Sequence, residues 1–280
     1  MQPKLQRRVQ RYGWDKASVH YDRYWARQIE PSQALLLEMA QLRPGDRVVD
    51  IACGTGLVTW PAAEAVGPDG LVVATDISDR MVELVNDEAE RRGLGQVRGA
   101  RMGAEELELD DDSFDATLNA LGLMYVPDPV RALNEMRRVL RPGGRAAAAV
   151  WGRRDRCGWA EIFPIVDCRV ETEVCPLFFQ LGTGDALEYA FEAAGFDRIT
   201  SRRISSSLHY EDEEEALGAA FVGGPVAMAY ARFDDATREE AHAEYLESIE
   251  PYRNGSGYRI PGEFVVTLGF NEPASTPEDR

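Results

Sequence analysis

The stretch "VVDIACGTG" at residues 48–56 limits what this chain can fold into more than any other feature. Its apolar first half is typical of a buried strand, and Asp50 falls near the end of that strand. A buried carboxylate is costly unless something binds it. Gly54 and Gly56 allow a tight turn that approaches a ligand closely, and the helix that follows points its amino end at the same place. The stretch therefore predicts a ligand site at a strand end.

Helical and strand patterns alternate from residue 31 onward, which is typical of a parallel sheet covered on both faces. We therefore predict an α/β fold, a seven-stranded and mostly parallel sheet with helices on both faces. The expected strands are residues 47–51, 71–76, 97–102, 114–121, 145–151, 198–210 and 258–270. The expected helices are residues 31–42, 59–66, 79–92, 129–140 and 185–194, with more helical pattern over 211–250.

Two stretches, residues 153–182 and 211–255, fall outside this alternation. Insertions beside the functional edge of a sheet often shape a pocket, so we expect helical insertions there that line one. The expected parts of the chain are a helical segment at 1–30, the ligand-binding half of the core at 31–152, the remainder of the core with its insertions at 153–270, and a disordered tail at 271–280.

The formal net charge of -17 opposes binding to nucleic acid and to anionic membrane surfaces. The amino terminus is a local exception that we interpret as a solvated end, with Lys4, Arg7, Arg8 and Arg11. It lacks the apolar core of a secretory signal, and no apolar run approaches the roughly 20 residues of a membrane-spanning helix. We therefore expect a cytoplasmic protein with no nucleic-acid and no membrane partner.

No metal site is expected, because the cysteines and histidines lack the spacing of metal ligands. The cysteines, which we interpret as free thiols, are Cys53, Cys157, Cys168 and Cys175. The histidines lie far apart, at His20, His209 and His242.

A second acid narrows the class of ligand that we expect. Asp76 ends the second expected strand, twenty residues after Gly56, where a carboxylate can accept both hydroxyls of a ribose. A dinucleotide site would want a third glycine where this chain has Thr59. Asp50, four residues before Gly54, would also repel a pyrophosphate. The pair of acids suits a ligand that carries a positive charge.

Four motifs in order and spacing carry a resemblance to a known family: "VVDIACGTG", "VVATDIS", "GAEELELDDDSFDATLNALGLMYVPDP" and "EMRRVLRPGG". Over about residues 18–151 the chain resembles class I S-adenosylmethionine-dependent methyltransferases, nearest the group similar to ubiquinone and menaquinone C-methyltransferases. The resemblance implies a Rossmann-like methyltransferase fold and S-adenosylmethionine as cofactor. It also implies that residues 1–30 act as a lid over that cofactor, with Tyr21 placed for a cation–π contact with the sulfonium.

The resemblance also implies which residues hold the cofactor. Asp50 and the turn after it would take the methionine end, Asp76 the ribose hydroxyls, and Gly103–Glu105 the adenine edge. The family often has an acid or Asn where this chain has Gly103, so Glu105 or backbone groups would have to bind the adenine amino group. The full set implied is Tyr21, Asp50, Ala52, Cys53, Gly54, Thr55, Gly56, Asp76, Ile77, Met81, Gly103, Ala104, Glu105, Asn119 and Ala120.

The acceptor is expected to be a small, partly apolar molecule such as a quinone, a phenol or a natural product, methylated on O, N or C. The residues expected to line its pocket are Tyr24, Trp25, Met124, Tyr125 and Trp151. Because the donor is already activated, placement of the acceptor in a closed pocket is the main task of the protein. If a general base is needed, Tyr125 and His209 are the weak candidates.

Two other functions stay open from the sequence. A nicotinamide-dependent oxidoreductase can use a similar sheet, although Asp50 and the missing third glycine disfavour it. A protein that binds the cofactor without turnover is the second alternative. Whether the chain forms a homodimer also stays open.

Overall fold

The computed structural model describes residues 3–170 and 177–272. Cys175 and nearly all of the tail at 271–280 lie outside the described residues. None of the helices in the described ranges is long and apolar enough to cross a membrane.

The predicted fold class is confirmed by a mixed sheet with helices on both faces. Five strands are parallel, and β8 pairs antiparallel with β5 and with β6. The strand order reverses between β1 and β4, and such a switch point is where open α/β sheets bind ligands. The order across the sheet is β3 (Val97–Arg101), β2 (Leu71–Asp76), β1 (Arg47–Ile51), β4 (Phe114–Ala120), β5 (Leu140–Trp151), β8 (Gly257–Phe270) and β6 (Asp197–Tyr210), and the two-residue strand β7 (Arg253–Asn254) pairs with β8.

The strands carry apolar side chains on both faces of the sheet, and helices cover both faces. Val48 and Val72 pack into one hydrophobic cluster with α2 (Thr59–Val66) and α3 (Asp79–Arg92). The other face packs against α4 and α6, at Pro129–Arg138 and Ala186–Ala193. Central strands of this kind read as continuous apolar runs, which is why the sequence reveals them clearly.

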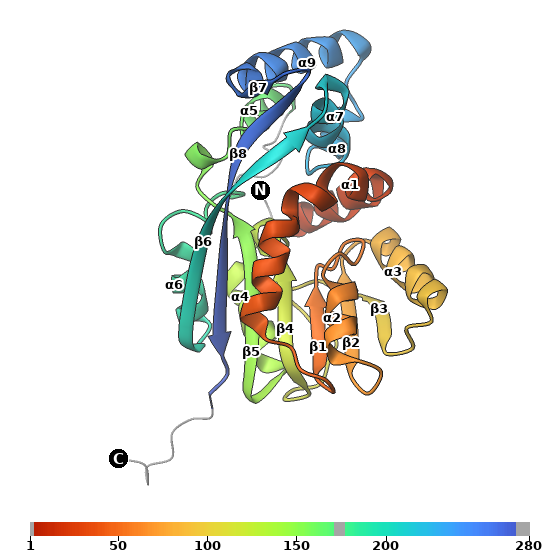
Figure 1. Ribbon diagram of the computed structural model, residues 1–280, viewed down its shortest axis with the longest axis vertical. Helices are drawn as coiled ribbons and strands as arrows, with labels where there is room; N and C mark the ends of the chain where they lie inside the picture. The colour runs from red at the N-terminus through yellow and green to blue at the C-terminus, as the bar shows by residue number, and fades with distance from the viewer. Residues whose placement is uncertain (1–2, 171–176, 273–280) are drawn as a thin grey trace.

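The remaining helices form an upper lobe above the sheet, and the outer ends of β6 and β8 reach into it (Figure 1). We use "upper lobe" for α5 (Ile162–Asp167), α7 (Glu213–Leu217), the π-helical turn η3 (Gly218–Val222), α8 (Ala227–Tyr230), α9 (Asp235–Ile249) and β7. The described ranges also contain three short 3₁₀ turns: η1 (Leu123–Tyr125), η2 (Arg154–Arg156) and η4 (Glu250–Tyr252).

The first helix differs from the expectation of two separate segments. α1 runs without interruption from Pro3 to Ala40, although Pro31 removes one backbone donor from its interior. Leu36 anchors the second half of the helix in the cluster beneath β1, and Trp25 and Ile29 pack into the cluster on the other side. Burial on both sides of the proline keeps the helix continuous, so one element serves the core and crosses the functional edge (Figure 1).

Candidate active site

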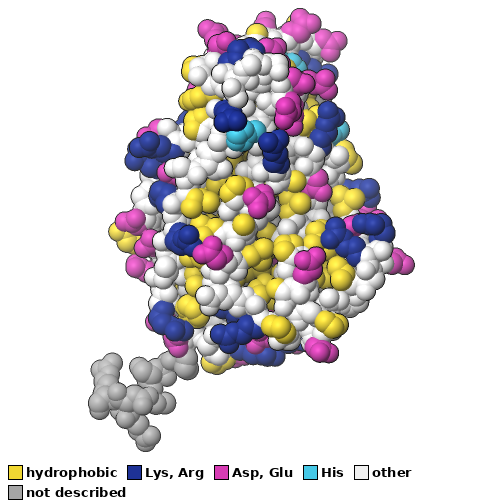
Figure 2. Space-filling view, viewed as in Figure 1, with side chains coloured by type: hydrophobic (Ala, Val, Ile, Leu, Met, Phe, Trp, Pro, Cys, Tyr) yellow, Lys and Arg dark blue, Asp and Glu magenta, His cyan; other side chains and the backbone are white. Residues whose placement is uncertain are grey.

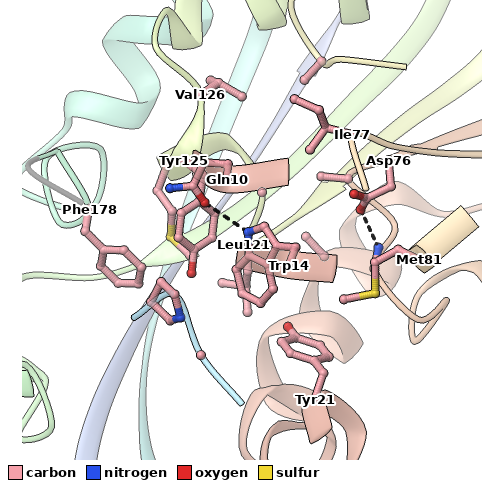
Figure 3. Close-up of a pocket in the computed structure, with 18 of the residues that line it drawn as sticks. Gln10, Trp14, Tyr21, Asp76, Ile77, Met81, Leu121, Tyr125, Val126 and Phe178 are labelled. Carbon is pink, nitrogen blue, oxygen red and sulfur yellow. Dashed lines mark hydrogen bonds between the residues drawn. The ribbon is translucent and has the colours of Figure 1, made fainter. Parts of the chain in front are cut away.

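A cavity lies beyond the carboxyl ends of β1, β2, β4 and β5, under the first half of α1. Figure 3 shows Asp76, Ile77 and Met81 at one end, Tyr125 and Phe178 at the other, and Trp14 between them. The two ends differ in chemistry. We call them the polar end and the aromatic end.

Asp76 is the buried acid of the polar end. Its carboxylate accepts backbone N–H bonds from Gly54 at 3.0 Å and from Ser78 at 2.9 Å. Burial raises the pKa of Asp76 to about 6, against the lowering effect of these bonds. Among the described residues no cation is paired with it, so the site favours a ligand that donates hydrogen bonds or brings positive charge.

Asp50 is a second buried acid, at the end of β1. Its Oδ2 accepts the hydroxyl of Thr59 at 2.6 Å. Burial, together with the nearby charge of Asp76, raises the pKa of Asp50 to about 7 against the lowering effect of the Thr59 bond. Asp50 lines a smaller hollow that adjoins the cavity and shares Ala52 and Gly54 with it. Two carboxylates held this way are stabilised by a cation placed near both.

The turn after β1 presents bare backbone to the cavity. Ala52 and Gly54 both have positive φ, at 57° and 55°. A Cβ added at Gly54 would meet nothing within 4 Å, and the same holds at Gly103, which also lines the cavity. Gly56 has another role, because a Cβ there would lie 2.6 Å from the ring of Trp60. Open space therefore faces two backbone segments of the polar end.

Asn119 shapes the loop after β4 instead of lining the cavity. Its Nδ2 donates to the carbonyl of Ile51 at 3.0 Å, and its Oδ1 accepts the N–H groups of Gly122 and Leu123 at 3.2 and 2.7 Å. A Cβ at Gly122 would lie 2.4 Å from the Cβ of Ala52. The loops after β1 and β4 therefore touch, and only glycine permits this approach.

The first half of α1 is tied to the loops around the cavity by polar bonds. The ties reach the segments that follow β1, β2, β3 and β4, so the helix crosses the whole functional edge. The ties are Gln6 to the carbonyl of Tyr125 at 3.1 Å, Arg7 to Glu105 at 2.6 Å, Arg11 to Asp79, Asp15 to the hydroxyl of Ser78 at 2.6 Å, and Asp22 to the hydroxyl of Thr55 at 2.5 Å.

The aromatic end is built of rings that meet edge to face. Trp25, Trp151 and Trp159 form a triangle with ring centroids 4.8 to 6.0 Å apart. Tyr125 and Phe178 continue it at 5.4 Å. Edge-to-face packing fixes the positions of the rings, so this compartment offers flat apolar walls to a ligand.

Tyr21 stands between the two ends and keeps its proton. It lines the cavity from α1, and its ring meets that of Trp14 at 5.6 Å. Burial, and after it the charges of Asp22 and Asp76, raise the pKa of Tyr21. Its hydroxyl is therefore a hydrogen-bond donor and a poor base at neutral pH.

The structure brings most of the expected site residues to this one cavity. Those that line it are Tyr21, Trp25, Ala52, Gly54, Asp76, Ile77, Met81, Gly103, Ala104, Glu105, Ala120, Met124, Tyr125 and Trp151. Asp50 and Cys53 line the adjoining hollow, whereas Thr55, Gly56 and Asn119 support the surrounding loops.

Two expected residues lie elsewhere. Tyr24 points away from the cavity and packs against the π-helical turn, where a Cβ on Gly218 would lie 2.3 Å from its ring. His209 is not among the residues that line the cavity. Both backbone groups of His209 bond to the side chain of Gln28 in α1, at 2.8 and 2.7 Å. Tyr125 is therefore the one proposed base whose side chain reaches the cavity.

Several lining residues were missed from the sequence. Trp14 lies seven residues before Tyr21, and this spacing could have placed it on the same helix face. No local pattern marks those that come from the irregular stretches. The missed residues are Arg7, Gln10, Trp14, Ile29, Leu121, Gly122, Val126, Pro127, Trp159, Phe178, Gly224 and Pro225.

Comparison with known proteins identifies relatives over the first part of the chain. A model of the ubiE/COQ5 methyltransferase family matches residues 17–154. The ubiquinone/menaquinone biosynthesis C-methyltransferase UbiE of Idiomarina loihiensis is 40% identical over 197 residues, which cover 69% of this chain and 76% of that protein. The protein of the same name from Teredinibacter turnerae is 37% identical over 158 residues. These cover 56% of this chain and 62% of that relative, less than two thirds of its length.

A solved structure supports the fold. The crystal structure of YcgJ from Bacillus subtilis matches 88% of this chain and all of YcgJ, with a TM-score of 0.60 and 18% identity. The family model, the Idiomarina relative and this fold agree with one another. The chain therefore belongs to the ubiE/COQ5 methyltransferase family.

Proposed function

We propose that this methyltransferase binds S-adenosylmethionine at the polar end of the cavity and a small, flat, partly apolar acceptor at the aromatic end. One observation carries the proposal: a single cavity joins buried acids and open backbone to a compartment of aromatic rings. A quinol, a phenol or a ring-bearing natural product suits that compartment. The name of the Idiomarina relative assigns that protein to ubiquinone and menaquinone biosynthesis, which favours the quinol.

The residues of the polar end fit the proposed cofactor. Asp76 keeps free lone pairs beside its two backbone bonds, as two ribose hydroxyls require. The open space at Gly54 and Gly103 admits a ligand against bare backbone. Asp50 and Asp76 would together stabilise the positive charge of the sulfonium and the amino group.

The same acids argue against a nicotinamide cofactor. A pyrophosphate bound at the turn after β1 would lie beside Asp50 and Asp76, and both would repel it. The position of a third glycine is also taken by Thr59, whose hydroxyl is already bonded to Asp50. The two buried acids therefore disfavour an oxidoreductase function that uses a nicotinamide dinucleotide.

S-adenosylmethionine, when bound, supplies a methyl group on a positively charged sulfur. The chain needs no covalent nucleophile of its own for this chemistry. Its rings hold the acceptor at the aromatic end, and α1 closes the cavity over both ends. Fixing the orientation of two reactants and excluding water can supply several kcal/mol toward the barrier. Tyr125, which lines the aromatic end, would bond an acceptor hydroxyl.

Calorimetry tests the cofactor assignment directly. S-adenosylhomocysteine should bind with one site per chain, and NADH should not bind. Acceptors are then screened with labelled donor, using hydroquinones and naphthoquinols with a free ring carbon, phenols and amines. Binding of NADH without S-adenosylhomocysteine would reject the proposal, and turnover of amines alone would reject the quinol or phenol class.

A further inference from the structure

The outward face of α1 carries large apolar side chains that the fold leaves uncovered. Leu5, Tyr12 and Val19 are spaced seven residues apart, so they project from the same face of the helix. Their side chains are 45%, 45% and 67% exposed. The opposite face lines the cavity with Gln10 and Trp14. One helix therefore faces the site on one side and shows an apolar stripe on the other.

Cations flank this stripe and have no acidic partner among the described residues. Lys4, Arg8 and Lys16 are exposed on the same side of the helix. The inward-facing cations of α1 are used differently, because Arg7 is paired with Glu105 and Arg11 with Asp79. The outward face is therefore both apolar and positively charged.

The negative charge of the protein is concentrated elsewhere. Residues 211–250 carry twelve acidic side chains and two arginines, and acidic side chains gather over the upper lobe in Figure 2. At physiological salt a charge is screened over about 8 Å. The net charge of -17 therefore does not set the local potential at the outward face of α1.

We propose that the outward face of α1 docks on an anionic lipid surface. A helix lies in a bilayer interface when its apolar side chains enter the acyl boundary and its cations meet lipid phosphates. Leu5, Tyr12 and Val19 would be the inserted residues, and Lys4, Arg8 and Lys16 the phosphate contacts. This docking is independent of which ligands the cavity takes.

A second copy of the chain fits this face less well. The acidic upper lobe of another molecule could match the cations. However, within the described part of residues 211–250 no large apolar side chain is exposed to cover the stripe. A bilayer offers both the negative charge and the apolar phase.

Vesicle co-sedimentation of the full chain tests the docking. We compare vesicles of phosphatidylcholine alone with vesicles that contain one third phosphatidylglycerol, at low and at high salt. Binding is expected to the anionic vesicles at low salt and to weaken as salt is added. Equal binding to both vesicles, or none to the anionic ones, would overturn the proposal.

Variants locate the docking face. Replacing Lys4, Arg8 and Lys16 together by Ala should lower the vesicle partition coefficient about a hundredfold, from roughly 1 kcal/mol for each cation. The variant Leu5→Ser/Tyr12→Ser/Val19→Ser should also lose binding, whereas Tyr189→Ser, an exposed control on α6, should not. Circular dichroism and binding of S-adenosylhomocysteine show that each variant is folded.

Sedimentation velocity without lipid tests whether a second copy of the chain covers the outward face of α1 instead. The wild type should sediment as the same species as the serine variant. A dimer that the serine substitutions dissociate would assign the face to a second copy and overturn the lipid proposal.

Discussion

The two ends of the cavity are made in different ways. The polar end consists of the loops after β1, β2 and β3, where backbone conformation and two buried acids create the site. The aromatic end is assembled from rings on α1, on η1 after β4, on β5 and on the irregular stretch that follows β5. The family model stops at residue 154, before Trp159 and Phe178. The polar end is thus built from local loops, and the aromatic end depends on residues distant in sequence.

The sharpest test of this contrast is Asp76→Ala. Loss of two hydrogen bonds to a charged acceptor should weaken binding of S-adenosylhomocysteine by about 2 to 3 kcal/mol, roughly 30- to 150-fold. Isothermal titration calorimetry measures the change. Asp87→Ala, an exposed acid on α3, is the matched control. Unchanged affinity for S-adenosylhomocysteine in a folded Asp76→Ala protein would show that Asp76 does not bind the cofactor.

The pH dependence of the polar end is the next largest effect. The folded-state pKa of Asp50 is about 7 and that of Asp76 about 6, both above the ordinary 3.8. A raised carboxyl pKa means that the stability it contributes is fully present below the ordinary value of 3.8 and is lost as pH rises from there to 6 or 7. The free protein should therefore lose stability over this window.

Binding of S-adenosylmethionine should respond in the opposite direction. As Asp50 ionises, affinity for the cation should rise about tenfold between pH 6 and 8. In the Asp50→Asn variant both trends should flatten, as measured by thermal unfolding and by calorimetry at each pH. A wild-type affinity that does not change over this range would contradict a role for Asp50 in binding the cation.

Trp159→Leu addresses the aromatic end. Removing one ring of the triangle should lower kcat/KM for the acceptor about fivefold, since aromatic pairs contribute about 0.5 to 1.5 kcal/mol beyond their area. The affinity for S-adenosylhomocysteine, measured on the same sample, should stay constant. If both quantities fall together, the two ends are not separate compartments.

His209→Gln should have the smallest effect. The backbone of His209 is bonded to Gln28 and its side chain is not part of the cavity lining, so kcat and its pH profile should stay within about twofold of wild type. A large fall in kcat together with loss of the acidic limb of the pH profile would restore His209 as the base.

The sequence reveals the sheet and the polar end because both depend on local patterns. Buried parallel strands appear as apolar runs, and an acid followed by glycines marks the end of β1. The place of Asp76 in the site is predicted from its position at the end of β2. None of these features requires knowledge of distant contacts.

The parts that the sequence does not reveal depend on contacts between distant segments. Pro31 suggests a helix boundary, yet packing on both sides keeps α1 continuous. Tyr24 and Trp25 are neighbours in sequence, but only Trp25 faces the cavity. Gly224 and Phe178 reach the aromatic end from loops without any periodic pattern. Tertiary packing, and not local propensity, decides these positions.

The long pairing of β6 with β8 has a mechanical consequence. Each strand has 14 residues and spans roughly 45 Å, from the sheet into the upper lobe (Figure 1). The upper lobe is therefore attached to the sheet by a long ladder of backbone hydrogen bonds. A swinging motion of the lobe would have to break bonds of that ladder. The upper lobe therefore keeps its position relative to the aromatic end. The amino-terminal turns of α1, by contrast, are held over the cavity by a few side-chain bonds.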